Sequence, residues 1–248
     1  MASSWERRPK TISLCFFDGT DMTSQEASLP RNVPEGTIFV IGAGHFGGRA
    51  ARLLAGKTSA PVFIVDCDEL QIEGLRDLPV QRIHFDGVRF LAGNFHILSP
   101  SNMIVPAVPF HLAYEWLKAF SVGTYSIRKV AFPQEARSSL PLSWEGTEGS
   151  LLVSYADFMC PDDCEEPEFC TVTGERRENP LHDLLAHLHT KGFGVHIIRS
   201  VQLAPGVGGY PAETLMNLWR RVRPEHGKRW ILGTACRCHG ILTAFEIL

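Results

Sequence analysis

Apolar runs separated by polar stretches predict strands alternating with helices along the first half of this 248-residue chain. Residues 37–41 and 61–65 are β-branched and aromatic runs, which are typical of strands buried on both faces of a parallel sheet. A third such strand is expected to begin at Met103. Apolar spacing predicts helices over residues 46–55, 69–78 and 111–120. Apolar and polar residues alternate over 82–85 and 88–91, which predicts two strands around a turn at Asp86-Gly87.

The second half of the chain follows a polar stretch, residues 133–150, whose composition indicates a boundary. Beyond it the pattern predicts two helices, 180–190 and 211–221, and four strands, 151–155, 194–201, 229–235 and 241–247. This order favours a small α+β domain with its helices on one face. The glycines of residues 206–211 are interpreted as a loop, with an anion-binding nest as the alternative.

The expected fold class is therefore α/β, with a Rossmann-like parallel sheet domain followed by a smaller α+β domain that carries a cysteine-rich loop. The expected boundaries are an N-terminal extension over residues 1–35 that includes a short strand at 11–17, the sheet domain over 36–132, a linker over 133–150 and the cysteine-rich domain over 151–248.

A glycine motif, Gly42-Ala43-Gly44-His45-Phe46-Gly47, joins the first strand to the first helix and predicts a dinucleotide site. Its three glycines allow a tight turn, a close approach of backbone to a diphosphate, and close packing of the helix against the strand. The N-terminus of that helix directs unpaired N–H groups at the anion. The second strand ends at Asp66-Cys67-Asp68, where Asp66 is expected to bind the ribose hydroxyls. A carboxylate there repels a 2′-phosphate, so NAD is favoured over NADP.

These residues resemble a known group of nucleotide-binding domains. Residues 41–54 together with 63–68 are similar to TrkA-type potassium-uptake regulators and, more distantly, to precorrin-2 dehydrogenase and Gfo/Idh-type oxidoreductases. The resemblance covers residues 37–130 and implies a fold that binds NAD(H). The TrkA-type pattern has Gly-Asp after its third strand, where this chain is expected to have Gly93-Asn94.

His111 is the candidate catalytic residue. The run Pro109-Phe110-His111 follows an apolar strand, as the Pro-x-x-His of Gfo/Idh-type enzymes does near the nicotinamide, although the spacing here is one residue shorter. The end of a parallel strand is where ligands collect in open α/β sheets. The alternative is a histidine that caps the helix or lies on the surface.

Five cysteines cluster in the second half and form a candidate metal site. Cys160, Cys164 and Cys170 lie in one loop, and Cys236 and Cys238 lie between the last two strands. If both segments lie at the same end of the domain, four thiolates can hold zinc or an iron–sulfur cluster. His239 or His182 could replace one thiolate. The alternative is unliganded thiols in an acidic loop.

Composition narrows the range of partners. The net charge of −3 gives no reason to expect nucleic acid, and no apolar run is long enough for membrane insertion. The N-terminus is not a signal peptide, so a cytoplasmic location is expected, in which the seven cysteines should remain reduced.

Three functions agree with these patterns. The first is an NAD(P)-dependent oxidoreductase or redox-accessory protein with a cysteine-ligated metal centre, acting with a redox partner protein or as a homo-oligomer. The second is a non-catalytic NAD(H)-sensing module, as the TrkA-type resemblance implies. The third is a metal-bearing structural or maturation factor. Hydride exchange with a substrate would distinguish the first from the second.

Overall fold

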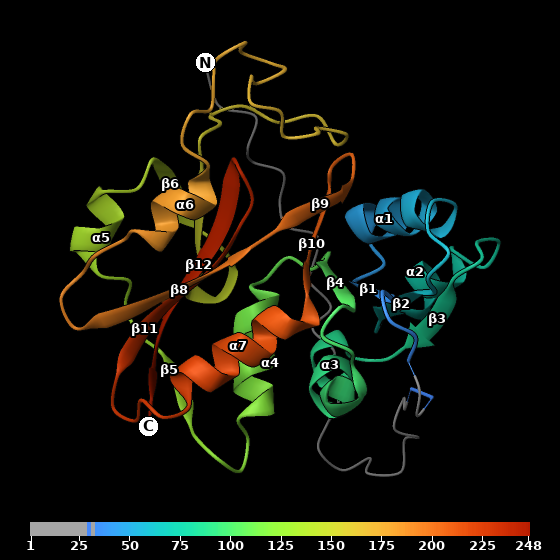
Figure 1. Cartoon of the computed structure of the whole chain (residues 1–248), viewed down its shortest axis with the longest axis horizontal. Helices are drawn as coiled ribbons and strands as arrows, with labels where there is room; N and C mark the ends of the chain where they lie inside the picture. The colour runs from blue at the N-terminus through green and yellow to red at the C-terminus, as the bar shows by residue number, and fades with distance from the viewer. Residues whose placement is uncertain (1–28, 31–32) are drawn as a thin grey trace.

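The computed structural model describes residues 29–30 and 33–248, and the expected strand at 11–17 lies outside them (Figure 1). The described residues form a mixed α/β fold with two six-stranded sheets. No helix among them is long and apolar enough to cross a membrane.

The first sheet contains four parallel strands in the order β3-β2-β1-β4, extended by the antiparallel hairpin β10-β9. Residues Phe39, Val40 and Ile64 are fully buried because helices cover both faces of these strands. The strands are β1 (Ile38–Ile41), β2 (Val62–Asp66), β3 (Gln81–His84), β4 (Met103–Pro106), β9 (Val201–Ala204) and β10 (Val207–Pro211).

Two helices cover one face of this sheet, and two others lie on the opposite face. Ala50, Ala51 and Leu54 of α1 pack with Val40 and Ile64 on the first face. Phe90 of α3 and Trp116 of α4 pack with Phe39 on the second face. The helices are α1 (His45–Ala55), α2 (Glu69–Glu73), α3 (Gly87–Asn94), the short 3₁₀ turn η1 (Phe95–Ile97) and α4 (Leu112–Phe120).

The second sheet has the order β6-β7-β12-β11-β8, and β5 also pairs with β12. All its pairs are antiparallel except β11 with β8. Its elements are β5 (Ile127–Lys129), α5 (Gln134–Ser138), β6 (Leu142–Glu145), η2 (Thr147–Gly149), β7 (Leu151–Ser154), α6 (Leu181–Ala186), β8 (Phe193–Arg199), α7 (Ala212–Val222), β11 (Arg229–Ala235) and β12 (His239–Ile247).

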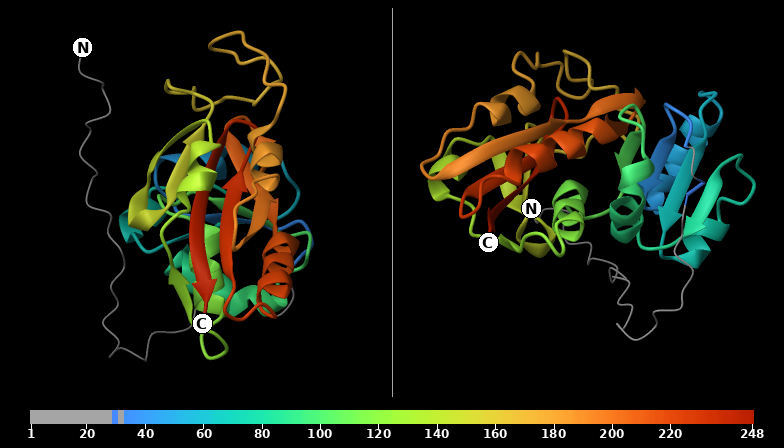
Figure 2. Two further views of the ribbon diagram at one scale, coloured as in Figure 1. Left: turned by 90° about the vertical axis from the view of Figure 1, so that its left-hand side faces the viewer. Right: turned by 60° about the horizontal axis from the view of Figure 1, so that its bottom comes forward.

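One buried apolar cluster is common to the two sheets. A single buried cluster contains Phe39 of β1, Trp116 of α4, Leu215 of α7 and Phe245 of β12. Only Ser200 separates β8 of the second sheet from β9 of the first, so one extended segment crosses both sheets, drawn in orange in Figure 2. Apolar packing in this cluster therefore continues across the expected boundary at residues 133–150.

Three local predictions were wrong, each for a recognisable reason. Residues 88–91 belong to α3, whose N-cap is Asp86, because Asp followed by Gly suits a helix start as well as a turn. The expected linker contains α5 and β6, and its polar composition reflects the exposure of the edge strand β6. The glycine stretch expected as a loop or anion nest is β10, whose glycines let its backbone lie close to β4.

The helices of the second half do not share one face of the second sheet, as the element order predicted. Leu181 and Leu185 of α6 pack on one side with Ile231, whereas Leu215 and Leu218 of α7 pack on the other side with Trp230. Neighbouring residues of β11 therefore face opposite helices, as the alternation of a strand requires.

Candidate nucleotide pocket and cysteine cluster

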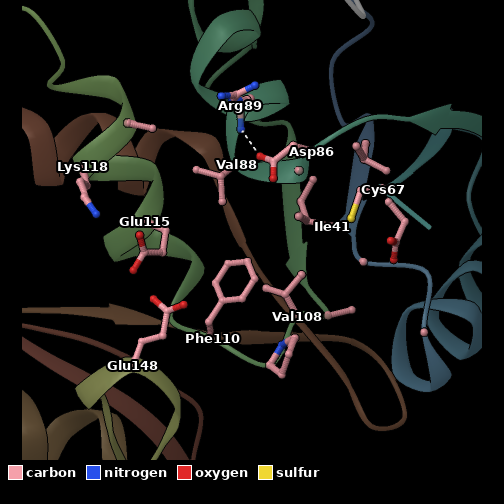
Figure 3. A pocket seen from close by; sticks show the side chains of 18 of the residues that line it. Ile41, Cys67, Asp86, Val88, Arg89, Val108, Phe110, Glu115, Lys118 and Glu148 are labelled. Atoms are coloured by element: carbon pink, nitrogen blue, oxygen red, sulfur yellow. Dashed lines mark hydrogen bonds between the residues drawn. The ribbon is translucent and has the colours of Figure 1, made fainter. Parts of the chain in front are cut away.

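A pocket of about 650 Å³ lies at the carboxyl ends of β1, β2 and β4 (Figure 3). Ile41, Asp66 and Ala107 line it from the ends of these strands, and residues 86–89 line it from the start of α3. The strand order reverses between β1 and β4, which is where ligands bind in open α/β sheets. Its volume is within the range of small-molecule sites.

The three glycines of the predicted motif have three different environments. Gly42 has φ +102°, and a Cβ atom there would lie 2.4 Å from the carbonyl oxygen of Ala107. A Cβ atom at Gly47 would lie 1.8 Å from the oxygen of Gly42, so this glycine permits helix–strand packing. Around Gly44 no protein atom lies within 4 Å of such a Cβ atom. The space beside Gly44 is therefore open to a ligand.

Asp66 is fixed at the rim of the pocket by backbone donors. Its Oδ2 accepts a hydrogen bond from the N–H of Ala43 at 2.5 Å, and its Oδ1 accepts one from the N–H of Asp68 at 2.8 Å. Each carboxylate oxygen keeps a second lone pair for a ribose hydroxyl. The carboxylate and the glycine loop are thereby held in one arrangement.

The residues after β3 are part of the pocket, which the sequence did not indicate. Asp86 and Arg89 both line it, and the N–H of Arg89 donates to Asp86 Oδ1 at 2.8 Å (Figure 3). The third strand ends at His84, and the first acid after it is Asp86, which follows Phe85 rather than a glycine.

The far end of the pocket is polar, and it was also not predicted. Glu115 and Lys118 come from α4, Glu148 comes from η2, and Phe110 lies between them and the glycine loop (Figure 3). Lys129 Nζ lies 2.9 Å from Glu115 Oε1 and 3.4 Å from Glu148 Oε2. Glu148 has φ 53°, an uncommon backbone for a residue with a side chain. No local motif links Glu148 to the glycine loop, since only the tertiary fold brings them together.

Some of the predicted nucleotide contacts line the pocket, and others have different partners. Cys67 lines the pocket together with Gly42, Gly44 and Asp66. Asp68 is instead the N-cap of α2, where its side chain accepts from Leu70 N–H. His45 Nε2 bonds to Asp162 Oδ2 at 2.7 Å, and Phe46 is exposed next to it.

Cys67 is disulfide-bonded in this structure, although it was expected to be reduced. The prediction was wrong because composition does not reveal which thiols come within bonding distance.

His111 is buried away from the pocket. Its Nδ1 lies 2.8 Å from Thr243 Oγ1, and its Nε2 lies 3.2 Å from Thr234 Oγ1. Burial lowers the pKa of this imidazole to about 3, with a further contribution from the positive charge of Lys129. His111 is the N-cap residue of α4, but its side chain makes no capping bond. Its position between β11 and β12 supports a structural role and not the predicted catalytic one.

The two cysteine segments lie at the same end of the second sheet. Cys160 Sγ is 3.5 Å from Nε2 of His239, although 79 residues separate them along the chain. His182 lies under the same turn, where its N–H donates to the carbonyl of Cys236 at 3.2 Å. As the side chains stand, no three or more His, Cys, Asp or Glu residues in the described ranges are arranged to hold a metal ion.

The electrostatic environments of the five thiols differ. Burial raises the pKa of Cys160, with further contributions from Cys164 and Cys170, and burial with the Glu166 carboxylate raises that of Cys238 to about 11. Hydrogen bonds from Thr173 lower the pKa of Cys170 to about 7. Carboxylates near a thiol raise its pKa, but at Cys170 the hydrogen bonds from Thr173 outweigh the charge of the acidic loop.

Comparison with known proteins gives two matches. Residues 113–248 match the family described as "AF_1314_C: Uncharacterized protein, C-terminal domain". A protein of Archaeoglobus fulgidus, described as "Uncharacterized protein", is 30% identical over 220 residues, which cover 84% of this chain and 98% of that relative. The matched family region begins within α4 and includes the whole cysteine cluster. From the extent of both matches, the chain belongs to the AF_1314 C-terminal domain family.

Proposed function

We propose that this protein binds NAD(H) in the pocket at the ends of β1, β2 and β4, and that its first four strands form a Rossmann-type nucleotide site. The observation that carries the proposal is the open space beside Gly44, next to an Asp66 carboxylate held by the glycine loop itself. A diphosphate would receive the N–H groups at the start of α1, and Asp66 would receive the ribose hydroxyls.

The proposed site prefers NADH over NADPH. Asp66 lies where the 2′-position of the adenosine ribose would be, and Asp86 adds a second carboxylate at this end of the pocket. A 2′-phosphate would meet two negative charges here, with Arg89 as the one nearby cation among the residues that line this end.

An oxidoreductase function is supported by the polar far end of the pocket. A nicotinamide extending along β4 would lie towards Phe110, within reach of Glu115, Lys118 and Glu148. These side chains offer hydrogen bonds and a proton source to a small polar substrate that exchanges a hydride with the nicotinamide. The NAD(H)-sensing module is the second candidate, because His111 does not reach the pocket.

The experiment is a calorimetric titration of the full chain with NADH and with NADPH. We expect saturable NADH binding, with NADPH weaker by about tenfold or more, which corresponds to about 1.4 kcal/mol. The Gly44→Ala variant should bind NADH at least about tenfold more weakly, because its methyl group occupies ligand space rather than protein space. Gly56→Ala is the matched control, since no atom lies within 4 Å of a Cβ atom there either.

Two results would count against the proposal. If neither nucleotide binds at millimolar concentration, the pocket is not a nicotinamide nucleotide site. If Gly44→Ala binds NADH as the wild type does, the nucleotide binds somewhere else. Tight NADH binding without oxidation by any substrate would favour the sensing module over the oxidoreductase.

A further inference from the structure

The loop between β7 and α6 and the β11–β12 turn form a thiol-rich cluster that the nucleotide pocket does not use. Besides the approach of Cys160 to His239, the N–H of Arg237 donates to Glu166 Oε2 at 3.2 Å. Nη1 of Arg237 donates to the carbonyl oxygen of Arg177 at 3.0 Å. Three separate contacts thus hold the two segments together.

Backbone N–H groups are directed at the sulfur atoms of Cys164 and Cys236. The N–H of Glu166 donates to Cys164 Sγ at 3.4 Å, and the N–H of His239 donates to Cys236 Sγ at 3.3 Å. Each of these sulfur atoms therefore has a polar partner within its own segment.

A buried cation lies among the same thiols. The Arg177 side chain is 12% exposed, and its charge acts on Cys160, Cys170 and Cys238. Its Nε is fully buried without a hydrogen-bond partner. An unpaired buried donor is unfavourable, because it has lost its hydrogen bonds to water without gaining a partner. A negatively charged group at the centre of the cluster would offset that cost.

The loop has little else to hold it in place. Between β7 and α6 its regular structure consists of one isolated bridge, Phe169 with Arg176. Met159, Phe169 and Val172 are all exposed, so the loop has no apolar core of its own. Small segments of this kind are usually stabilised by disulfides or by a metal. The five clustered cysteines are not in disulfides.

From these contacts we propose that Cys160, Cys164, Cys170 and Cys238 bind one soft metal ion of the zinc class as a four-thiolate site, with Arg177 balancing part of its negative charge. The proposal is independent of nucleotide binding. The Cys160–His239, Arg237–Glu166 and Arg237–Arg177 contacts bring the loop that carries Cys160, Cys164 and Cys170 against the turn that carries Cys238.

Cys236 is the thiol left out of the set. It lies under its own turn, where it accepts the N–H of His239, and Glu166 is its charged neighbour. Metal binding requires the four chosen thiols to release their protons to solvent and to turn their sulfur atoms inward, as is usual when a site forms on loading.

The experiment combines metal analysis with cobalt substitution on the full chain. Protein purified without oxygen should contain about one equivalent of zinc, and Co²⁺ added to metal-free protein should give the intense sulfur-to-metal absorption of a tetrahedral thiolate site. Cys238→Ser should lose at least about 90% of the metal. Cys236→Ser, the control in the same turn, should retain it.

Circular dichroism and thermal unfolding of each variant check that loss of metal is not loss of fold. Absence of zinc together with absence of Co²⁺ binding in the folded wild type would overturn the proposal. Equal loss of metal in folded Cys236→Ser and Cys238→Ser would overturn the ligand set. Iron with acid-labile sulfide and broad absorption at about 400 nm would identify an iron–sulfur cluster in place of a single ion and would overturn the zinc assignment.

Discussion

Burial determines what His111 can do. An imidazole that is 4% exposed and bonded to two threonine hydroxyls is held in its neutral form by burial, because the hydroxyls carry no charge to compensate a buried imidazolium. The residue type and its place after a strand predicted catalysis, but neither reveals which side of α4 the ring faces.

This histidine makes the stability of the fold depend on pH. The folded pKa is about 3, whereas the unfolded value is 6.5, so below pH 6.5 the unfolded chain binds a proton that the folded chain does not. The free energy of unfolding should therefore fall as pH falls from about 6.5 towards 3, with a slope of up to about 1.4 kcal/mol per pH unit from this residue. His196, whose pKa burial lowers to about 4, adds to the slope.

The slope can be measured by urea unfolding at a series of pH values. His111→Asn should be less stable at neutral pH and should show a shallower slope between pH 6.5 and 4. His189→Asn, at an exposed position, should keep the wild-type slope. An unchanged slope in His111→Asn would mean that another group dominates the acid response.

Among the elements, the hairpin β9–β10 connects the two halves of the molecule. Tyr210 and Pro211 pair with Ile104 and Met103 of β4, which would otherwise be an edge strand. A Cβ atom at Gly209 would lie 2.8 Å from the oxygen of Ile104 and 3.1 Å from a methyl group of Leu203. The strand can therefore approach β4 only because this residue is glycine.

Gly209→Ala should destabilise the protein by about 1–3 kcal/mol through this overpacking. Gly93→Ala is the control, because a Cβ atom at Gly93 in α3 has no neighbour within 4 Å and alanine favours a helix. Urea unfolding should show a loss for the first variant and none for the second. Equal stabilities of Gly209→Ala and the wild type would show that β10 can move away from β4 at little cost.

The elements that the sequence predicted well are those with a strong local pattern. The run from β1 to β2 was predicted to within about a residue, because continuous apolar strands and a glycine motif specify it locally. Convergence of the cysteine segments was a condition of the expected metal site, and the 3.5 Å approach of Cys160 to His239 meets it. β10 was missed because Gly208 and Gly209 disfavour a strand, and only contact with β4 makes it one. Glu115 and Glu148 of the pocket were missed for the same kind of reason, since their proximity is purely tertiary.

On the scale of the whole molecule, the shared core predicts that the chain unfolds in a single transition. Trp116 of α4 and Trp230 of β11 lie in the same buried cluster as Phe39 of the first sheet. Tryptophan fluorescence and circular dichroism should therefore report the same urea midpoint. Two separated midpoints would instead indicate that the sheets unfold as independent domains.

The bond between His45 and Asp162 has a consequence for the whole molecule. His45 directly follows Gly44, and Asp162 lies between Cys160 and Cys164, so one side-chain contact joins the start of α1 to the cysteine loop. Arg49, one turn further along α1, donates to the carbonyl of Pro205 at 2.7 Å, and the N–H of the neighbouring Gly206 donates to the carbonyl of Cys164 at 3.0 Å. If metal binding fixes the loop against α1 and thereby raises the affinity for NADH by some factor, NADH must raise the affinity for the metal by the same factor. Because thermodynamic linkage is reciprocal, the measured affinity for each ligand would then depend on whether the other is bound.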